Sequence, residues 1–302
     1  MGLIKINKIA VKKFILNYLP KSLSKFSRIW YLRLTSKRRL VRRNELHFNI
    51  HLADHCNLNC KGCLHFSPLS AEKFLDLQTF ERDLKRIFEL SGGKVSDICL
   101  LGGEPLLHPD IELFFPIARK YFSKNRIYIL TNGLLLPKMS ETFFEECKKH
   151  DIGIAISYYP VKIDIEKIKA ITDKYAVSLE IRDEYNKGPS IWLRQPLDID
   201  GRQNIKKSYK TCAMGNSCVH LVDGKIYQCD TAAYIHYFNK YFNKNLTVQD
   251  NDYIDIHKIT DIKEIFNFLC SPIPFCRYCK TKDVEYIKWE ISNKDINEWT
   301  KV

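Results

Sequence analysis

The chain has 302 residues, enough for one large domain or two smaller ones. Its 16 Tyr and 17 Phe, with Gly and Pro at ordinary levels, argue against wholesale disorder. No stretch approaches about 18 uninterrupted apolar residues, so we expect no transmembrane helix. The net charge of +13 comes from the N-terminal end, because residues 1–43 hold 13 Lys and Arg but no Asp or Glu.

Apolar residues alternate with the charges in this basic segment, which is typical of an amphipathic helix lying on an anionic membrane. The alternative is a solvated helix that packs on the body of the protein. We expect no nucleic-acid partner, because no base-reading module accompanies the charge. Lysines interrupt every apolar run, so the segment is no secretory signal. We therefore predict a cytoplasmic protein with an N-terminal arm, residues 1–44, that contacts the inner membrane face peripherally.

Strands alternate with helices between residues 47 and 181, which predicts parallel β/α units and an α/β fold, a partial (β/α)6 TIM-like barrel over residues 45–205. The expected strands are 47–52, 96–101, 126–130, 152–157 and 177–181. The expected helices are 80–90, 111–121, 139–149 and 163–175.

Polar or metal-binding residues follow four successive strands of this pattern. They are the cysteine loop at 56–63, then Gly102-Gly103-Glu104-Pro105, then Asn132, then Ser157. In β/α barrels the chemistry lies on loops at the carboxyl ends of the strands. We expect the four features to form one site.

Beyond residue 205 the pattern changes to a hairpin around Asp223-Gly224, a helix near 262–269 and another near 294–300. We predict a small α+β domain over residues 206–302, held together by cysteines. Eleven cysteines without a secretory signal indicate a reducing compartment, where thiols bind metals or do chemistry.

The stretch CNLNCKGC places Cys56, Cys60 and Cys63 in a C-x3-C-x2-C spacing. Three thiolates can hold three corners of a 4Fe-4S cube and leave the fourth iron open to a chelating small molecule. The glycines after the second strand allow close backbone approach, and Glu104 offers a carboxylate to an ammonium group or to its neighbours. The alternative is a Cys3His zinc site that uses His65.

These motifs resemble those of the radical S-adenosylmethionine (radical SAM) superfamily, and Thr131-Asn132-Gly133 after the third strand adds to the likeness. The resemblance implies that the three cysteines hold a 4Fe-4S cluster whose open iron binds the amine and carboxylate of SAM. It further implies that Gly102, Gly103, Glu104 and Pro105 cradle the amino group, that Asn132 belongs to the cofactor-binding residues and that Ser157 reaches the ribose. At the end of the fourth strand the family often has Ser-Leu-Asp, whereas this chain has Ser157-Tyr158-Tyr159.

A second cysteine set lies in the last third of the chain. Its layout resembles the SPASM and Twitch auxiliary-cluster domains. The thiols suffice for one further cluster, which we expect to be a 4Fe-4S cluster. The expected ligands are Cys212, Cys229, Cys276 and Cys279, with Cys218 as a rival for Cys212 and Cys270 as a lesser rival. A structural zinc ribbon is the alternative.

The resemblance implies an enzyme that cleaves SAM reductively to a 5′-deoxyadenosyl radical and abstracts hydrogen from a substrate. We favour oxidation of a sugar or aminocyclitol in surface polysaccharide or secondary metabolism, with flavodoxin or ferredoxin as reductant. One alternative is a peptide-modifying maturase, and another is a non-catalytic zinc-binding interaction protein.

Overall fold

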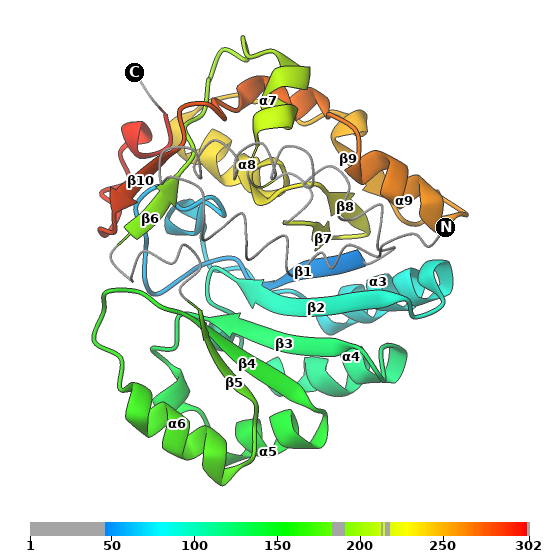
Figure 1. The fold of residues 1–302 in the computed structure, drawn as a ribbon, viewed down its shortest axis with the longest axis vertical. Coiled ribbons are helices and arrows are strands. Elements are labelled where there is room, and N and C mark those ends of the chain that lie inside the picture. Colours follow the sequence, from blue (N-terminus) through cyan, green and yellow to red (C-terminus); the bar gives the residue numbers. More distant parts are fainter. Residues whose placement is uncertain (1–45, 183–190, 213, 215–217, 301–302) are drawn as a thin grey trace, which may run out of the picture. The chain divides into compact units, whose positions relative to one another are not determined.

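The computed structural model describes residues 46–182, 191–212, 214 and 218–300 (Figure 1). Contacts divide the chain into two units, Met1–Arg43 and Asn44–Val302. The predicted basic arm, residues 1–44, lies outside the described residues, so its membrane contact stays a prediction. Within the described part, no helix is long and apolar enough to cross a bilayer.

One eight-stranded sheet organises the fold, with the order β5-β4-β3-β2-β1-β7-β8-β9. β1 to β5 pair in parallel as neighbours, β7 joins β1 in parallel, and β8 and β9 continue the sheet in antiparallel. This mostly parallel sheet confirms the α/β class and the partial barrel. The strand bounds are β1 Leu46–Ala53, β2 Val95–Gly102, β3 Arg126–Thr131, β4 Ile152–Ser157, β5 Leu179–Arg182, β7 His220–Val222, β8 Lys225–Tyr227 and β9 Tyr253–Asp255.

β6 (Ile191–Arg194) does not extend the parallel run beyond β5. It pairs in antiparallel with β10 (Glu285–Lys288) and forms a separate two-stranded sheet. The hairpin expected around Asp223-Gly224 is present as β7 and β8, and it belongs to the barrel sheet.

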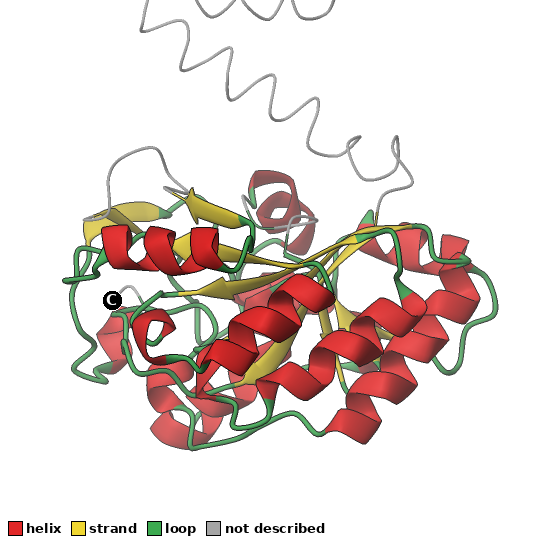
Figure 2. Cartoon of the chain, turned by 90° about the horizontal axis from the view of Figure 1, so that it is seen from below, coloured by secondary structure: helices red, strands yellow, loops and turns green. Residues whose placement is uncertain are grey.

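Helices α3 to α6 each connect two consecutive parallel strands and cover one face of the sheet (Figure 2). Side chains of Asp76, Ser140 and Asp164 accept a backbone N–H at the start of α3, α5 and α6, which fixes where these helices begin. The α-helix bounds are α3 Leu77–Ser91, α4 Phe114–Tyr121, α5 Glu141–Lys149, α6 Ile165–Lys174, α7 Ile205–Thr211, α8 Asp230–Phe242 and α9 Ile262–Leu269.

Short 3-10 turns connect several elements, and two of them replace parts of expected helices. The segment expected to be helical from 111 begins as the turn η3, and the one expected near 294–300 is only the turn η7. The bounds are η1 Ser67–Leu69, η2 Pro105–Leu107, η3 Ile111–Leu113, η4 Leu136–Lys138, η5 Asp250–Asp252, η6 Pro274–Tyr278 and η7 Ile296–Glu298.

The buried apolar residues form two clusters. The first lies between the sheet and its helices, and it includes Leu221 and Ile265 from the last third of the chain. The second surrounds α8, with Phe66, Phe238 and Trp299 fully or almost fully buried. Both clusters take residues from each side of position 205, so the domain boundary proposed there stays a prediction.

Candidate active site

Cys56, Cys60 and Cys63 line one cavity of about 300 Å³, which we call the cysteine-loop cavity. Its wall also includes Gly102, Gly103, Asn132 and Ser157. These residues lie at or just beyond the carboxyl ends of β1 to β4. The structure therefore brings together the features that follow four successive strands, as expected for a β/α barrel.

Cys60 is buried and Cys56 and Cys63 are half-buried, and loss of hydration is the main reason that the pKa values of the three thiols are raised, to about 12 for Cys56. Nearby cysteine charges add to this effect at Cys56 and Cys60. The Trp289 Nε1 donates to Cys60 Sγ at 3.1 Å, and the Leu58 N–H donates to Cys56 Sγ at 3.4 Å. Because their pKa values are raised, the thiols ionise only when a cation binds them. This property and the N–H donors to sulfur fit an iron–sulfur cluster.

The two glycines after β2 are required by the close approach of two backbones. A Cβ on Gly102 would lie 2.0 Å from the carbonyl oxygen of Ala53, and one on Gly103 would lie 2.4 Å from that of His55. The Gly103 N–H also donates to the Ala53 carbonyl at 2.8 Å. The glycines thus fix the second loop against the end of β1, and a side chain would also intrude beside the cavity that both glycines line.

Glu104 is fully buried and joins the loops after β2 and β3. Its carboxylate accepts hydrogen bonds from Thr131 Oγ1 at 2.6 Å, from the Asn132 N–H at 2.9 Å and from the Leu106 N–H at 3.1 Å. Burial outweighs these bonds and raises the pKa of Glu104 to about 7. The sequence suggests that this carboxylate binds either an ammonium group or neighbouring residues. The structure shows it bound to neighbouring residues. Pro105 follows it as the first residue of η2.

Asn132 connects the third loop to the cysteine loop. Its Nδ2 donates to Asn57 Oδ1 at 2.7 Å, while its Oδ1 accepts from the Leu134 N–H at 3.0 Å. Ser157 ends β4 opposite Arg182 of β5, and both residues line the cavity. The cofactor contacts predicted for Asn132 and Ser157 stay predictions.

The second cysteine set surrounds another, smaller cavity, which we call the C-terminal cysteine cavity. Burial and the nearby charges of acidic residues and other cysteines raise the pKa of Cys229, Cys276 and Cys279, to about 11 for Cys276. Cys218 lines the cysteine-loop cavity instead, and Cys270 caps the end of α9. The residues of the set that line this cavity are Cys212, Cys229, Cys276 and Cys279.

Several residues of the cysteine-loop cavity were not singled out from the sequence, among them Asp230, Arg182 and Tyr159. His65 lines it too, but its Nδ1 bonds the Gly102 carbonyl at 3.1 Å and its Nε2 lies 3.7 Å from Asp230 Oδ2. A usable signal for Asp230 is its position directly after Cys229.

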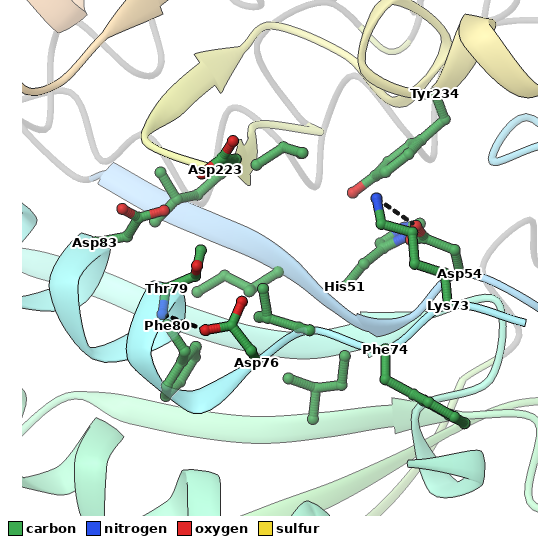
Figure 3. Close-up of a pocket in the computed structure, with 15 residues that line it drawn as sticks. His51, Asp54, Lys73, Phe74, Asp76, Thr79, Phe80, Asp83, Asp223 and Tyr234 are labelled. Carbon is green, nitrogen blue, oxygen red and sulfur yellow. Dashed lines mark hydrogen bonds and ion pairs between the residues drawn. The ribbon is translucent and has the colours of Figure 1, made fainter.

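A third cavity of about 260 Å³ is lined by residues of β1, the start of α3 and β7 (Figure 3). Here His51 Nδ1 lies 2.7 Å from Asp54 Oδ1, Lys73 Nζ lies 3.4 Å from Asp54 Oδ2, and the Tyr237 hydroxyl donates to the same carboxylate. These contacts lower the pKa of Asp54 although burial opposes them, so Asp54 is ionised.

Comparison with known proteins shows which family the sequence matches. The model of the radical SAM superfamily matches residues 50–208, which is more than half of the chain. The GTP 3′,8-cyclase of Chlorobaculum tepidum is 33% identical over 141 residues, 46% of this chain and 40% of that protein. The molybdenum cofactor biosynthesis protein 1 of Dictyostelium discoideum is 33% identical over 99 residues, 32% of this chain and 15% of that protein. The matches thus span less than half of these relatives.

Two solved structures are similar at low identity. BtrN in complex with AdoMet and 2-DOIA is 15% identical with a TM-score of 0.48, over 78% of this chain and 93% of that one. Native anSMEcpe with bound AdoMet is 17% identical with a TM-score of 0.49, over 84% and 93%. The fold assignment rests on the sheet order given above. Superfamily members are enzymes that use a 4Fe-4S cluster and SAM. By the extent of the family match, this chain belongs to the radical SAM superfamily.

Proposed function

We propose that this chain is a radical SAM oxidoreductase with one auxiliary iron–sulfur cluster, a 4Fe-4S cluster. When bound, the first cluster and SAM supply a 5′-deoxyadenosyl radical, which takes a hydrogen atom from the substrate. In this proposal Cys56, Cys60 and Cys63 hold the first cluster, and Gly102, Gly103 and Ser157 lie against SAM. The auxiliary cluster is held by Cys212, Cys229, Cys276 and Cys279.

The observation that carries the proposal is that the two cysteine cavities share part of their lining. Met214 lines both, and the consecutive residues Cys229 and Asp230 line one each. A substrate that has lost a hydrogen atom must lose one more electron and one proton to become a carbonyl compound. A cluster in the neighbouring cavity is suited to accept that electron.

The wall of the cysteine-loop cavity supports a small polar substrate. Apart from the residues expected to contact SAM, Arg182 and Asp230 present a cationic and an anionic group to this cavity. Hydroxyl and amino groups of a sugar or aminocyclitol would pair with these side chains. We therefore favour such a substrate, in surface polysaccharide or secondary metabolism, with flavodoxin or ferredoxin as the electron donor.

Iron content after anaerobic reconstitution tests the two-cluster proposal. We expect about eight irons per chain in the wild type and an absorbance shoulder near about 420 nm. Cys212→Ala should retain about four irons, whereas the matched variant Cys218→Ala should retain about eight, because Cys218 lines the other cavity. Two zinc ions and no colour would contradict the proposal, and the reverse order of the two variants would contradict the ligand set.

Isotope transfer tests the reaction. A sugar or aminocyclitol deuterated at a carbinol carbon should pass deuterium to 5′-deoxyadenosine and yield a product that has lost two hydrogens. Cys60→Ala should abolish the transfer. Deuterium from a peptide, with none from any sugar, would overturn the substrate class and favour a peptide-modifying enzyme.

A further inference from the structure

A cluster of imidazole rings lies beside the cysteine-loop cavity, and the function proposed above leaves it unused. The ring centroids of His51, His65 and His220 are 4.7 to 5.6 Å apart, and Tyr234 stacks on His51 at 3.9 Å. Among the described residues, the buried side-chain atoms without a hydrogen-bond partner include His51 Nε2, the Tyr234 hydroxyl and both ring nitrogens of His220. Each such atom costs roughly 1–3 kcal/mol. Four of them in one place indicate that the fold accommodates a further partner there.

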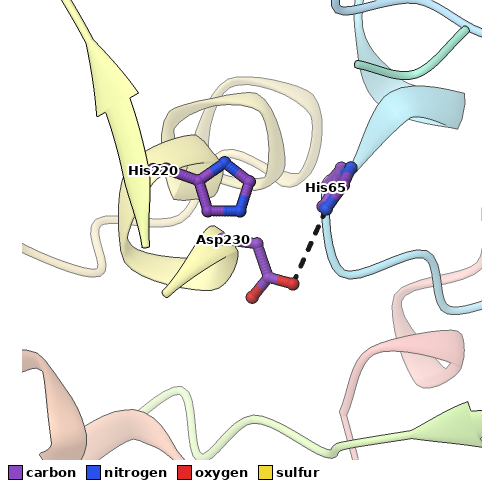
Figure 4. A group of neighbouring side chains, drawn as sticks. All are labelled: His65, His220 and Asp230. Carbon is purple, nitrogen blue, oxygen red and sulfur yellow. Dashed lines mark ion pairs between the residues drawn. The ribbon is translucent and has the colours of Figure 1, made fainter. Parts of the chain in front are cut away.

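Three of the neighbouring side chains converge as a donor set (Figure 4). His65 follows the cysteine loop, His220 begins β7, and Asp230 begins α8. One ligand atom from each lies within 4.8 Å of the other two. His220 and Asp230 are buried, and His65 and Asp230 line the cysteine-loop cavity, which gives an ion a route of entry.

The outer contacts of this set orient its donor atoms toward one another. A carbonyl oxygen only accepts hydrogen bonds, so the contact of His65 Nδ1 with the Gly102 carbonyl places the proton on Nδ1 and leaves Nε2 toward Asp230. Asp230 Oδ1 accepts from the N–H of Thr231 at 2.6 Å and from its Oγ1 at 3.1 Å, which leaves Oδ2 for the centre of the set. A ring nitrogen lone pair and a carboxylate oxygen that face each other repel unless a cation or a proton lies between them.

His220 supplies a second imidazole to this set. Both of its ring nitrogens are buried without a hydrogen-bond partner, so a lone pair is available for a ligand. Two neutral imidazoles and one carboxylate form a set typical of Zn²⁺ and of non-haem Fe²⁺, with coordination positions left open.

We propose that His65, His220 and Asp230 bind one divalent transition-metal ion, separate from both cysteine sets. Ligand atoms about 2.1 Å from one ion lie within about 3.5 Å of each other, so binding draws the three side chains together from their present separation. The open positions of the ion are directed to the cysteine-loop cavity, because two of its three ligands line that wall.

Such an ion would hold a hydroxyl or amino group of the substrate and lower the pKa of a bound hydroxyl. This role rests on the function proposed above, whereas the binding of the ion does not. A metal-binding measurement without SAM or substrate therefore separates the two proposals.

The test uses the protein with both clusters reconstituted, incubated anaerobically with Zn²⁺ alone, desalted and analysed for zinc and iron. We expect about one zinc per chain in the wild type in addition to about eight irons. His220→Gln and Asp230→Asn should lose at least four fifths of the zinc and keep their iron, which shows that fold and clusters are intact. The matched control His257→Gln, an exposed histidine that contacts Asp83, should keep the zinc.

Three results would overturn the proposal. They are a wild type without zinc, a His220→Gln variant that binds as much zinc as the wild type, and zinc that enters only as iron leaves. If the wild type binds no zinc, the contact between His65 and Asp230 is an ordinary ion pair. Should deuterium transfer fail while stoichiometric zinc is retained, the proposed function would be wrong and the metal site would stand.

Discussion

The buried carboxyl group of Glu104 should make the stability of this protein depend on pH in an unusual direction. Three donors surround it, yet burial raises its pKa from the ordinary 4.5 to about 7. The folded protein therefore binds this proton more tightly than the unfolded chain. A carboxyl group with a raised pKa favours folding most below pH 4.5, and that contribution is lost as the pH rises through 7.

The magnitude follows from the two pKa values. Between pH 5 and pH 8 the ionisation of Glu104 lowers the free energy of unfolding by roughly 2.5 kcal/mol. Glu104→Gln removes the ionisation but leaves a side chain of similar shape. The variant should therefore gain roughly 2.5 kcal/mol relative to the wild type over this range, which corresponds to about 4 °C in Tm for a chain of this length.

Thermal unfolding of both proteins, measured anaerobically without SAM at pH 5 and pH 8, checks this expectation. Glu166→Gln, on the exposed face of α6, is the control, and its difference from the wild type should change by less than about 0.5 kcal/mol. If the Glu104→Gln difference is the same at both pH values, or if the wild type gains as the pH rises, the hydrogen bonds from Thr131, Asn132 and Leu106 outweigh burial and the reasoning is refuted.

Two further predictions concern the hydrogen bonds of Arg119 and the steric fit of Gly102. Replacing Arg119 by Met should lower the free energy of unfolding by about 2–4 kcal/mol, with Arg119→Lys in between, and an unchanged urea midpoint would contradict this. The guanidinium donates to the carbonyls of Phe122, Ser123, Asn125, His150 and Asp151. Gly102→Ala should reduce both the yield of folded protein and its iron content, because the new methyl group would overlap the Ala53 carbonyl. Gly153→Ala, whose added Cβ meets nothing closer than 3.6 Å, should remain close to the wild type, and equal behaviour of the two variants would refute the steric argument.

The features that the sequence predicts well are local. The spacing of Cys56, Cys60 and Cys63 and the alternation of strands and helices depend on neighbouring residues, and the bounds expected for β1 to β5 agree with the structure within about two residues. Helix α8 was missed because eight of its thirteen residues are buried, which removes the amphipathic periodicity that identifies a helix.

The features that it does not predict depend on distant pairing. β7 joins the sheet at a single register point, Asn49 opposite His220, about 170 residues apart in the chain. That pairing carries His220 to His65 and leads the chain on to Asp230. No local pattern indicates that these three residues meet, so the donor set could be found only in three dimensions.

The position of β7 also limits which parts of the chain a homologue can lose. β1 lies between β2 and β7, so loss of the last third of the chain would turn a central strand into an open edge, with unpaired amides and carbonyls available to other copies. A homologue that dispensed with its C-terminal thiols would still need this segment as a cover against aggregation. We therefore expect that related proteins lose the C-terminal cysteines before they lose the segment that includes β7.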